Sequence, residues 1–427
     1  VGTQRPQGDF DQEIDCKGNV LMPGLVNAHT HVPMTPMRGY GGGHDLQSWL
    51  NDFIFPAEAK WDDRSARAAA DLGLAEMIAS GVTCIADMYM RTGVIAQEIV
   101  DAGISANLSC GGVYFGAAED FSENSCNDCR NQKVLTEQWH KHNDGQIMVD
   151  ASIHGEYTSN APLWQWMADY AQKKGLGMHV HVSETSFEHE ACKGRHGGKT
   201  PIQILDQYGV WENRAIAAHC VWVSEEDMDI MAHKHITAVH NPVSNLKLAS
   251  GVARTSLLAQ HGVNVALGTD GVASNNNHDL FEEIKLASLL QKGVNLDPVA
   301  VPASQALKMA TVNGAKALRR NKSKIIIGCA AAVVVAVGVF LGLFHPVICP
   351  QIVRTVIIAG KAEVTETESG LMKQLDAFFH GHFDTSLDGL SGILHSQRSV
   401  LCDLVRQSHR FFHQGFPLVQ GFDFGYQ

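Results

Sequence analysis

Two histidines near the start of the chain have the spacing to bind a metal ion together. His29 and His31 lie in the segment VNAHTH, residues 26–31, which follows an apolar run. Side chains of a β-strand alternate between its two faces, so residues two apart project from the same side. Two imidazoles placed in this way can bind one ion from a single strand, although a His-x-His pair alone is a weak signal.

Further residues suited to metal binding follow later in the chain. His181 lies in HVHVSET, residues 179–185, and Asp270 ends LGTD, residues 267–270. With His29 and His31 they provide three imidazoles and one carboxylate, a set that suits Zn2+ and is acceptable for Fe2+. We therefore interpret these four residues as the ligands of one divalent ion, Zn2+ first and Fe2+ as the alternative. Such an ion lowers the pKa of bound water toward about 7 and generates hydroxide at neutral pH.

Acid–base residues accompany the expected ligands. Of His179 and His181, we expect one to face the interior and the other the helices or solvent, and we choose His181 because Glu184 follows three residues later. Glu184 can carry a proton to the ring nitrogen of a heteroaromatic substrate. Asp270 can accept the proton of the attacking water, and His219 can bind metal or orient that water. Attack at an amino-bearing aromatic carbon followed by loss of ammonia is hydrolytic deamination.

The elements that would position these residues alternate along the chain. Helical patterns, such as 64–80, 163–174 and 224–234, separate eight apolar β-branched runs. The runs are 21–29, 81–87, 104–113, 147–154, 177–182, 215–220, 236–240 and 263–270. This alternation predicts an α/β fold with a parallel sheet covered by helices, and eight units over about 290 residues suit a (β/α)8 TIM-like barrel. An open doubly wound sheet would favour a glycine-rich phosphate loop after the first strand, and the sequence has none there.

Polar residues stand at the ends of several of these runs. They are His29 and His31, Asp87, His154, His181 with Glu184, His219, His240 and Asp270. Function in such a barrel sits at the carboxyl ends of the strands. The fourth run ends in SIHG, residues 152–155, without the lysine that often bridges two metals in barrels of this type, which favours a single ion.

Composition limits the classes of partner. The chain has 427 residues and a formal net charge of −12, and without a Lys/Arg block this argues against nucleic acid. We expect a small-molecule substrate and no membrane, and leave a homo-oligomer open. Ten cysteines without a regular framework, and no signal-peptide pattern at the start, favour the cytoplasm. We interpret CNDC, residues 126–129, as a surface loop rather than a zinc knuckle.

Longer segments carry a resemblance to a known family. They are PGLVNAHTHVPMTPMRGY (23–40), SWLNDFIFPAEAK (48–60), HVHVSET (179–185), AHC (218–220), HNPVSNLKLASG (240–251) and LGTDGVASNNNHDLFEE (267–283). In these segments residues 19–318 resemble the amidohydrolase superfamily, and within it the 5-methylthioadenosine/S-adenosylhomocysteine deaminases. The resemblance implies metal ligands at His29, His31, His181 and Asp270, with Glu184 and His219 catalytic.

The resemblance also implies contacts to a nucleoside. Glu58 matches the carboxylate that holds the ribose hydroxyls, Trp49 resembles an aromatic residue of the nucleoside pocket, and His154 resembles the residue that reaches a purine ring nitrogen. Each has a simpler alternative: a solvated charge at a helix start for Glu58, ordinary core for Trp49 and a hydrogen bond at the barrel rim for His154.

One departure from the family bears on the substrate. Members that bind the homocysteine carboxylate carry an arginine after the third strand, where this chain has LSCG, residues 108–111. Cys110 cannot make the bidentate contact of an arginine, and the register of Arg130 is open. This favours a nucleoside with a small or apolar 5′ group, such as methylthioadenosine or adenosine. The alternatives are deamination of guanine or cytosine, dechlorination of an s-triazine, and an inactive barrel that acts as a binding protein.

The two ends of the chain complete the expected domain organisation. We assign residues 1–24 and 321–365 to the two parts of a small β-sandwich domain and residues 25–320 to the metal-dependent barrel. Residues 366–427 are interpreted as an unassigned helical appendage. The uncharged run 325–344 is interpreted as strands, with a membrane span as the alternative.

Overall fold

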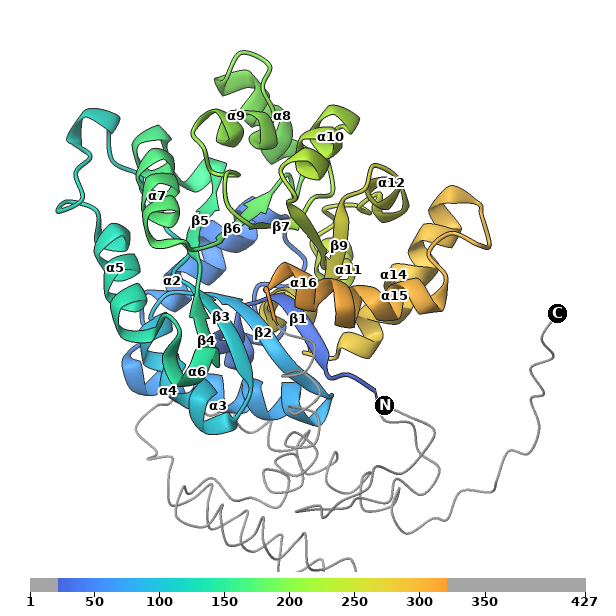
Figure 1. Cartoon of the computed structure of the whole chain (residues 1–427), viewed down its shortest axis with the longest axis horizontal. Helices are drawn as coiled ribbons and strands as arrows, with labels where there is room; N and C mark the ends of the chain where they lie inside the picture. The colour runs from blue at the N-terminus through green and yellow to red at the C-terminus, as the bar shows by residue number, and fades with distance from the viewer. Residues whose placement is uncertain (1–21, 321–427) are drawn as a thin grey trace, which may run out of the picture. The chain divides into compact units, whose positions relative to one another are not determined.

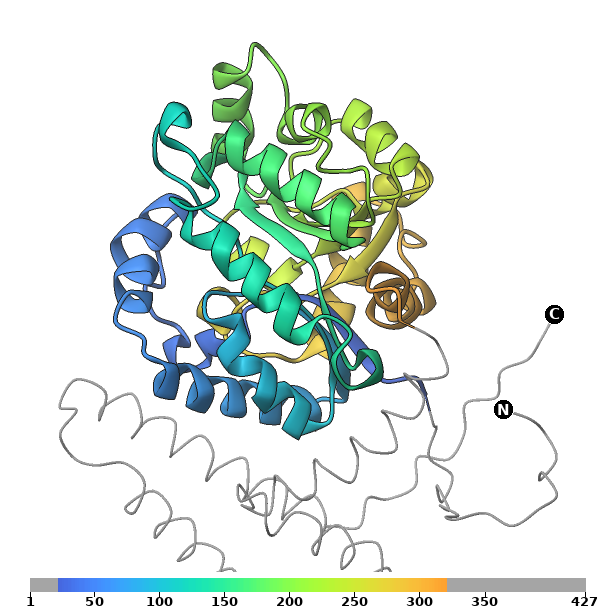
Figure 2. The same ribbon diagram turned by 60° about the vertical axis from the view of Figure 1, so that its left-hand side comes forward.

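The strands of this protein lie at its centre and the helices lie around them (Figure 1 and Figure 2). The computed structural model describes residues 22–320, and within them nine strands form two parallel sheets of order β1-β2-β3-β4 and β5-β6-β7-β8-β9. The strands are β1 (Leu25–Thr30), β2 (Val82–Met88), β3 (Ser105–Ser109), β4 (Ile147–Val149), β5 (Ala151–Gly155), β6 (Met178–Val182), β7 (Ala215–His219), β8 (Thr237–His240) and β9 (Asn264–Leu267).

The two sheets meet at both of their edges. Residue 150 separates β4 from β5 within one predicted run, so the nine strands occupy eight positions. A parallel bridge between Gly112 and Ile153 joins the segment after β3 to β5, and a second bridge joins Thr30 to Asp270. At this second junction the backbone N–H of Asp270 donates to His29 O at 3.0 Å. The predicted (β/α)8 barrel is confirmed.

The strands are buried because both of their faces are covered. Every residue of β1, β2, β6, β7 and β8 is buried, as a near-continuous apolar pattern predicts for parallel strands. Val26 and Ala28 of β1 pack with residues of β2, β7, β8 and β9 and with Ala315 and Leu318 near the end of the described chain. The approach is close at Gly314, where a Cβ atom would lie 2.8 Å from the Cβ of Val26.

The predicted helices are present at their expected positions. The run predicted at 64–80 is helix α3 (Asp63–Ala79), that at 163–174 is α7 (Ala161–Lys174) and that at 224–234 is α10 (Glu225–His233). The Asp62 side chain accepts from Ser65 N at 2.7 Å and so caps α3, while Ser224 and Asp227 form a capping box that starts α10.

The remaining α-helices are α1 (Leu46–Ser48), α2 (Phe55–Glu58), α4 (Thr92–Ala102), α5 (Asn127–Trp139), α6 (His142–Gly145), α8 (Ser186–Arg195), α9 (Pro201–Gln207), α11 (Pro242–Lys247), α12 (Thr255–Gln260), α13 (Val272–Asn275), α14 (Leu280–Asn295), α15 (Ala303–Lys308) and α16 (Gly314–Ala317). Short 3₁₀ segments are η1 (Val32–Met37), η3 (Ala118–Asp120) and η4 (Glu156–Thr158), and π-helical segments are η2 (Trp49–Ile54) and η5 (Met309–Asn313).

The surface-loop interpretation of the CNDC segment is wrong. Cys126 and Cys129 are buried, and Cys126 is the residue immediately before α5. Its sulfur accepts a hydrogen bond from Cys129 N at 3.3 Å, as a helix-capping group does. Helix α5 packs against β4, and both cysteines are free.

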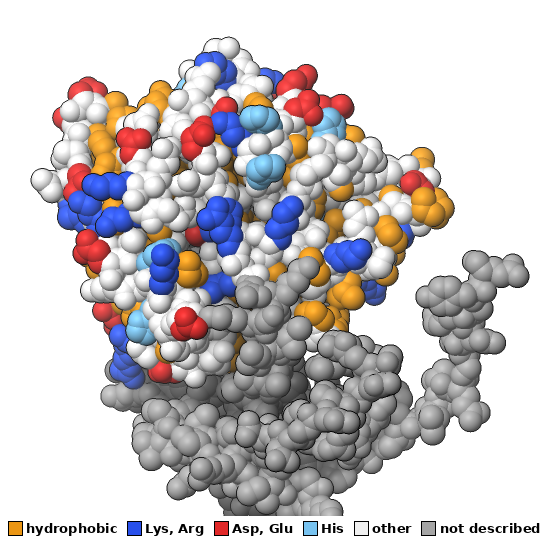
Figure 3. Space-filling view, viewed as in Figure 1, with side chains coloured by type: hydrophobic (Ala, Val, Ile, Leu, Met, Phe, Trp, Pro, Cys, Tyr) orange, Lys and Arg blue, Asp and Glu red, His pale blue; other side chains and the backbone are white. Residues whose placement is uncertain are grey.

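The outer surface mixes charged and apolar side chains (Figure 3). Large exposed apolar side chains of α14 and the loop that follows it include Phe281, Leu289, Val294, Leu296 and Val299. Within residues 22–320, no helix combines the length and the apolar character that crossing a membrane requires. The predicted segments 321–365 and 366–427, the run 325–344 and most of segment 1–24 lie outside the described residues.

Candidate functional site

Four side chains from three distant segments converge at the barrel interior. His29 lies near the end of β1, His31 directly follows that strand, His181 comes from β6, and Asp270 follows β9. The Oδ1 atom of Asp270 lies 3.1 Å from His31 Nε2 and 3.4 Å from His29 Nε2, and the Nε2 atoms of His31 and His181 lie 3.3 Å apart. The structure thus brings together all four predicted ligands.

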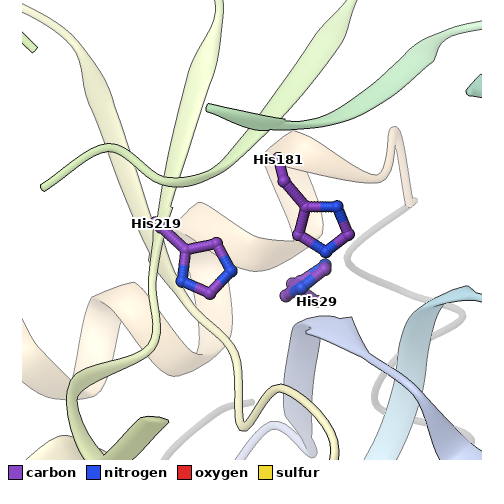
Figure 4. A group of neighbouring side chains, drawn as sticks. All are labelled: His29, His181 and His219. Atoms are coloured by element: carbon purple, nitrogen blue, oxygen red, sulfur yellow. The ribbon is translucent and has the colours of Figure 1, made fainter. Parts of the chain in front are cut away.

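The donor atoms have an arrangement that a cation would satisfy. The rings of His29, His181 and His219 turn toward one common space (Figure 4). In this group of three, the possible ligand atoms all lie within 4.8 Å of one another. The same holds for a second group, formed by His29, His31 and Asp270. His29 Nε2 is buried without a hydrogen-bond partner among the described residues. Two imidazole lone pairs at 3.3 Å repel unless a proton or a cation lies between them, so this set of three imidazoles and one carboxylate fits one divalent ion.

The atoms that face away from this space are held by neighbouring groups. His31 Nδ1 bonds to Met88 O, and His181 Nδ1 bonds to His154 O at 2.6 Å. His29 Nδ1 lies 2.9 Å from His179 Nε2. Such outer bonds fix the orientation of a metal-binding imidazole and leave its other nitrogen free.

The second oxygen of Asp270 is held in the same manner. Asp270 Oδ2 accepts hydrogen bonds from Ser244 Oγ at 2.6 Å and Ser274 Oγ at 2.9 Å. These bonds direct Oδ1 toward His29 and His31. The serines were not among the predicted site residues, although Ser244 lies in the HNPVSN segment that carries the family resemblance.

The charge of Asp270 attracts positive charge to the centre. Burial alone would raise the pKa of Asp270, but the adjacent imidazoles of His29 and His31, together with the charge of His31 and His219, hold it well below its usual range. Burial lowers the pKa of His29 to about 4. Burial also lowers the pKa of His31, but the hydrogen bond and charge of Asp270 outweigh it and raise that pKa to about 9. Either a proton on His31 or a cation among the four side chains compensates the buried carboxylate.

Glu184 and His219 form a second pair beside the first group. Glu184 Oε2 lies 3.6 Å from His219 Nε2, and Glu184 Oε1 accepts from Ser250 Oγ at 3.4 Å. Burial raises the pKa of Glu184, partly offset by the nearby His219. His219 Nδ1 bonds to Asn245 Oδ1 at 2.8 Å, which turns Nε2 toward Glu184. A buried carboxyl group with a raised pKa next to an imidazole is suited to proton transfer.

A further carboxylate holds the backbone at Glu184. Glu188, on the first turn of α8, accepts hydrogen bonds from the N–H of Ser183 at 2.9 Å and from that of Glu184 at 2.8 Å.

Three residues at the site have a left-handed backbone. Ser183 has a φ of 48°, and His219 and Asp270 have φ values of 72° and 60°. A left-handed backbone is uncommon for residues other than glycine, and its occurrence at or just beyond the ends of three strands at one site indicates strain that positions side chains.

Glu58 lies close to the candidate metal site. It is only 4% exposed, so the alternative of a solvated charge is wrong. Burial raises its pKa to about 7, against the opposing influence of Tyr89 and His31. Its predicted contact with ribose hydroxyls stays a prediction.

Trp49 and His154 lie at less distinctive positions. Trp49 is buried in an apolar cluster with Leu50 and Ile54, and its Nε1 donates to Tyr40 O at 3.1 Å. This geometry agrees with the core alternative, and the pocket role stays a prediction. His154 Nδ1 lies 3.0 Å from Thr158 Oγ1, and its ring centroid is 4.7 Å from that of His181. Burial, then the charge of His31, lowers the pKa of His154 to about 3.

The expectation that His179 or His181 faces outward is wrong. Both are buried, and His179 contacts the ring of His29 inside the barrel. Residues two apart in a strand share a face, so the alternation used for His29 and His31 should have placed both rings inside.

Cys110 and Arg130 both have partners within their own surroundings. Cys110 Sγ donates to Gln132 Oε1 at 3.2 Å, and burial raises the pKa of its thiol to about 12. Arg130 is exposed and bonds to Asn124 O and Asn127 Oδ1 within its own segment.

Comparison with known proteins gives matches over most of the chain. Residues 20–362 match the model of the amidohydrolase family. The 5′-deoxyadenosine deaminase of Methanothermobacter thermautotrophicus is 44% identical over 329 residues, 77% of this chain and 76% of that protein. The 5-methylthioadenosine/S-adenosylhomocysteine deaminase of Dictyoglomus thermophilum is 41% identical over 318 residues, 74% of this chain and 73% of that protein.

A solved structure is also similar. The crystal structure of an adenosine deaminase from Xanthomonas campestris with bound zinc has a TM-score of 0.65 and 34% identity, and the match covers 70% of this chain and 67% of that one. Fold and sequence similarity therefore extend over the same barrel that carries the convergent histidines.

Proposed function

Because this chain belongs to the amidohydrolase family, we propose that it is a metal-dependent hydrolytic deaminase that releases the amino group of an adenine nucleoside as ammonia. The observation that carries the proposal is the pair Glu184 and His219 next to the group formed by His29, His31 and Asp270. The relatives named as 5′-deoxyadenosine and 5-methylthioadenosine/S-adenosylhomocysteine deaminases support the choice of substrate.

The residues that would hold the ion are His29, His31, His181 and Asp270. Zn2+ is the ion we propose, with Fe2+ as the alternative, because imidazole and carboxylate ligands suit both. The chemistry that such an ion supplies is a lower pKa for a water molecule, toward about 7.

The side chains of this chain would move the protons. Asp270 accepts a proton from the water that adds to the amino-bearing ring carbon. Glu184, which burial keeps protonated to a higher pH than usual, gives its proton to the adjacent ring nitrogen. His219, fixed by Asn245, orients the water with its Nε2 atom. The C–N bond then breaks and the amino group leaves as ammonia with the proton taken up by Asp270. The remaining hydroxyl proton returns to Glu184, so the ring carbon keeps the oxygen as a carbonyl and both carboxyl groups regain their starting states.

The 5′ group of the substrate is the finer part of the proposal. Glu58 is the group we propose for the ribose hydroxyls. Cys110 is a neutral thiol and offers no charge to a carboxylate. We therefore propose adenosine, 5′-deoxyadenosine or methylthioadenosine in preference to S-adenosylhomocysteine, whose carboxylate would need a cationic partner.

A substrate panel tests the proposal. Zinc-loaded protein is mixed with adenosine, 5′-deoxyadenosine, methylthioadenosine, S-adenosylhomocysteine, guanine and cytosine, while ammonia release and the ultraviolet spectrum are followed. We expect turnover of the first three with a kcat/KM well above that for S-adenosylhomocysteine. Absence of turnover on every nucleoside by a protein that holds its metal would refute the deaminase proposal.

A further inference from the structure

An imidazole–imidazole contact lies behind the candidate metal site. His29 Nδ1 is 2.9 Å from His179 Nε2, and the two rings are close to perpendicular, with an interplanar angle of 76°. On its other side, His179 Nδ1 lies 3.4 Å from Ser109 Oγ, and Ser109 Oγ donates to Asp87 O at 3.2 Å. All four residues are fully or almost fully buried.

The two ends of this chain of contacts fix the direction of every proton in it. Asp87 O is a carbonyl oxygen and can only accept, so Ser109 uses its one hydroxyl proton there and accepts from His179 Nδ1. His179 Nε2 is then the acceptor nitrogen of a neutral ring, and His29 Nδ1 must donate to it. This places the lone pair of His29 on Nε2, the buried atom without a hydrogen-bond partner in the described part of the chain.

His29 differs in this respect from the other two histidine ligands we propose. His31 Nδ1 bonds to the carbonyl of Met88 and His181 Nδ1 bonds to the carbonyl of His154, and both acceptors belong to the backbone. The outer nitrogen of His29 instead meets a side chain, whose own tautomer must be set by a third group. The tautomer of His29 can therefore be changed by substitution, unlike those of His31 and His181.

We propose that His179 is a positioning residue that, with Ser109, holds His29 in the tautomer and orientation that bind the metal ion. This inference rests on the proposed function for the presence of a metal, and it adds a role for a side chain that is neither a ligand nor a contact to substrate. An outer partner of a metal-binding histidine typically changes metal affinity by about 10- to 100-fold when it is removed.

The experiment measures metal binding without substrate. Metal-free wild-type, His179→Leu and His179→Gln proteins are titrated with Co2+ and Zn2+ in competition with a chromophoric chelator. His179→Leu removes the acceptor, so we expect about 10- to 100-fold weaker binding and an altered visible spectrum of the Co2+ form. His179→Gln offers its Oε1 atom near the position of Nε2, so we expect it to recover most of the affinity and the wild-type spectrum.

The serine gives an independent variant with a matched control. Ser109→Ala removes the group that orients His179, and we expect a smaller loss, about two- to tenfold in metal affinity. Ser152→Ala removes a similarly buried serine of the barrel whose hydroxyl accepts Gly111 N at 2.7 Å, and we expect no change. Thermal unfolding of the metal-free proteins verifies that each variant is folded.

Wild-type affinity and spectrum in a folded His179→Leu protein would overturn the inference. If His179→Leu does not fold, the metal affinity of Ser109→Ala is compared with that of Ser152→Ala. Equal affinities of these two variants would overturn the inference. A wild-type protein that binds metal in a His179-dependent manner but deaminates no nucleoside would refute the proposed function and leave the inference standing.

Discussion

The Oε2 atom of Glu184, which follows β6, lies 3.6 Å from the Nε2 atom of His219, the last residue of β7. They meet because β6 and β7 are neighbouring parallel strands in which Val182 pairs with His219. Glu188 fixes the backbone N–H groups at Glu184, and Asn245 fixes the ring of His219. The pair is therefore held from both sides before any substrate arrives.

Replacement of Glu184 by glutamine should separate proton transfer from metal binding. Glu184→Gln keeps the shape of the side chain but cannot donate the acidic proton, so we expect kcat to fall by about 10²–10⁴-fold with unchanged metal content. Steady-state kinetics and elemental analysis measure the two effects. Glu190→Gln, at an exposed position on α8, is the matched control and should keep wild-type kcat. A Glu184→Gln protein with near-wild-type kcat would contradict the role.

The protonation of Glu58 should control nucleoside binding. Burial raises its pKa to about 7, so the carboxylate that would accept the ribose hydroxyls forms only as the pH rises through that value. We expect KM for adenosine to fall between about pH 6 and pH 8, and Glu58→Gln to have a higher KM without this pH dependence. Equal KM profiles of the two proteins would argue against the ribose contact.

The same shift has a consequence for stability. Because the pKa of Glu58 is raised in the folded state, its neutral form contributes stability that is present below the ordinary value of 4.5 and lost as the pH rises through about 7. The free energy of unfolding of Glu58→Gln should therefore exceed that of the wild type more at pH 8 than at low pH. Urea unfolding at several pH values measures this difference.

Removal of the metal should lower both activity and thermal stability. The ligands we propose come from distant segments of the chain, so an ion bound only by the folded chain stabilises it by about 2.7 kcal/mol at a free concentration of 100 Kd. We expect about one ion per chain by elemental analysis, loss of turnover and a lower Tm after chelation, and recovery of both with Zn2+. A metal content far below one per chain in active protein would contradict the single-metal site.

A buried ion pair away from the reacting groups should affect stability alone. Arg214 bonds to Asp150, whose carboxylate also accepts Asn107 Nδ2 at 2.8 Å and Gly177 N at 3.2 Å. Arg214→Ala leaves a buried charge without its partner, so we expect a loss of about 3–5 kcal/mol in the free energy of unfolding. At a temperature where the variant is folded, its kcat should equal that of the wild type.

The more accessible ion pairs of Lys234 provide the comparison for that loss. Lys234 contacts Asp206 at 3.2 Å and Glu212 at 2.5 Å near the surface, and Lys234→Ala should cost no more than about 1 kcal/mol. Equal losses in the free energy of unfolding for Arg214→Ala and Lys234→Ala would show that burial does not increase the contribution of the Arg214–Asp150 pair to stability. Chemical denaturation of both variants makes the comparison.

The sequence predicted the barrel well because its strands are buried on both faces. Such strands appear as apolar runs, and the polar residues that end them stand out clearly, as His219 and Asp270 do. The division of the fourth run into β4 and β5 was not predictable, since Asp150 interrupts the run only because Arg214, far along the chain, compensates its charge.

The residues that hydrogen-bond to the site residues were harder to predict from the sequence. Ser244 and Asn245 act through hydrogen bonds to Asp270 and His219, partners that lie 26 residues away along the chain and become neighbours only in the folded barrel. His179 is a different case, because the period of a strand already places it beside His181. The CNDC segment was misjudged because its spacing does not reveal the packing of α5 against the barrel.

The order of the two sheets has a consequence for dividing the protein. β1–β4 come from the chain before Asp150 and β5–β9 from the chain after it. His29 and His31 therefore belong to one half of the molecule, and His181, His219 and Asp270 to the other. If the chain were divided at Asp150, each fragment would lack part of the site and would be inactive. Turnover would return only when the two fragments associate, so activity would report their association.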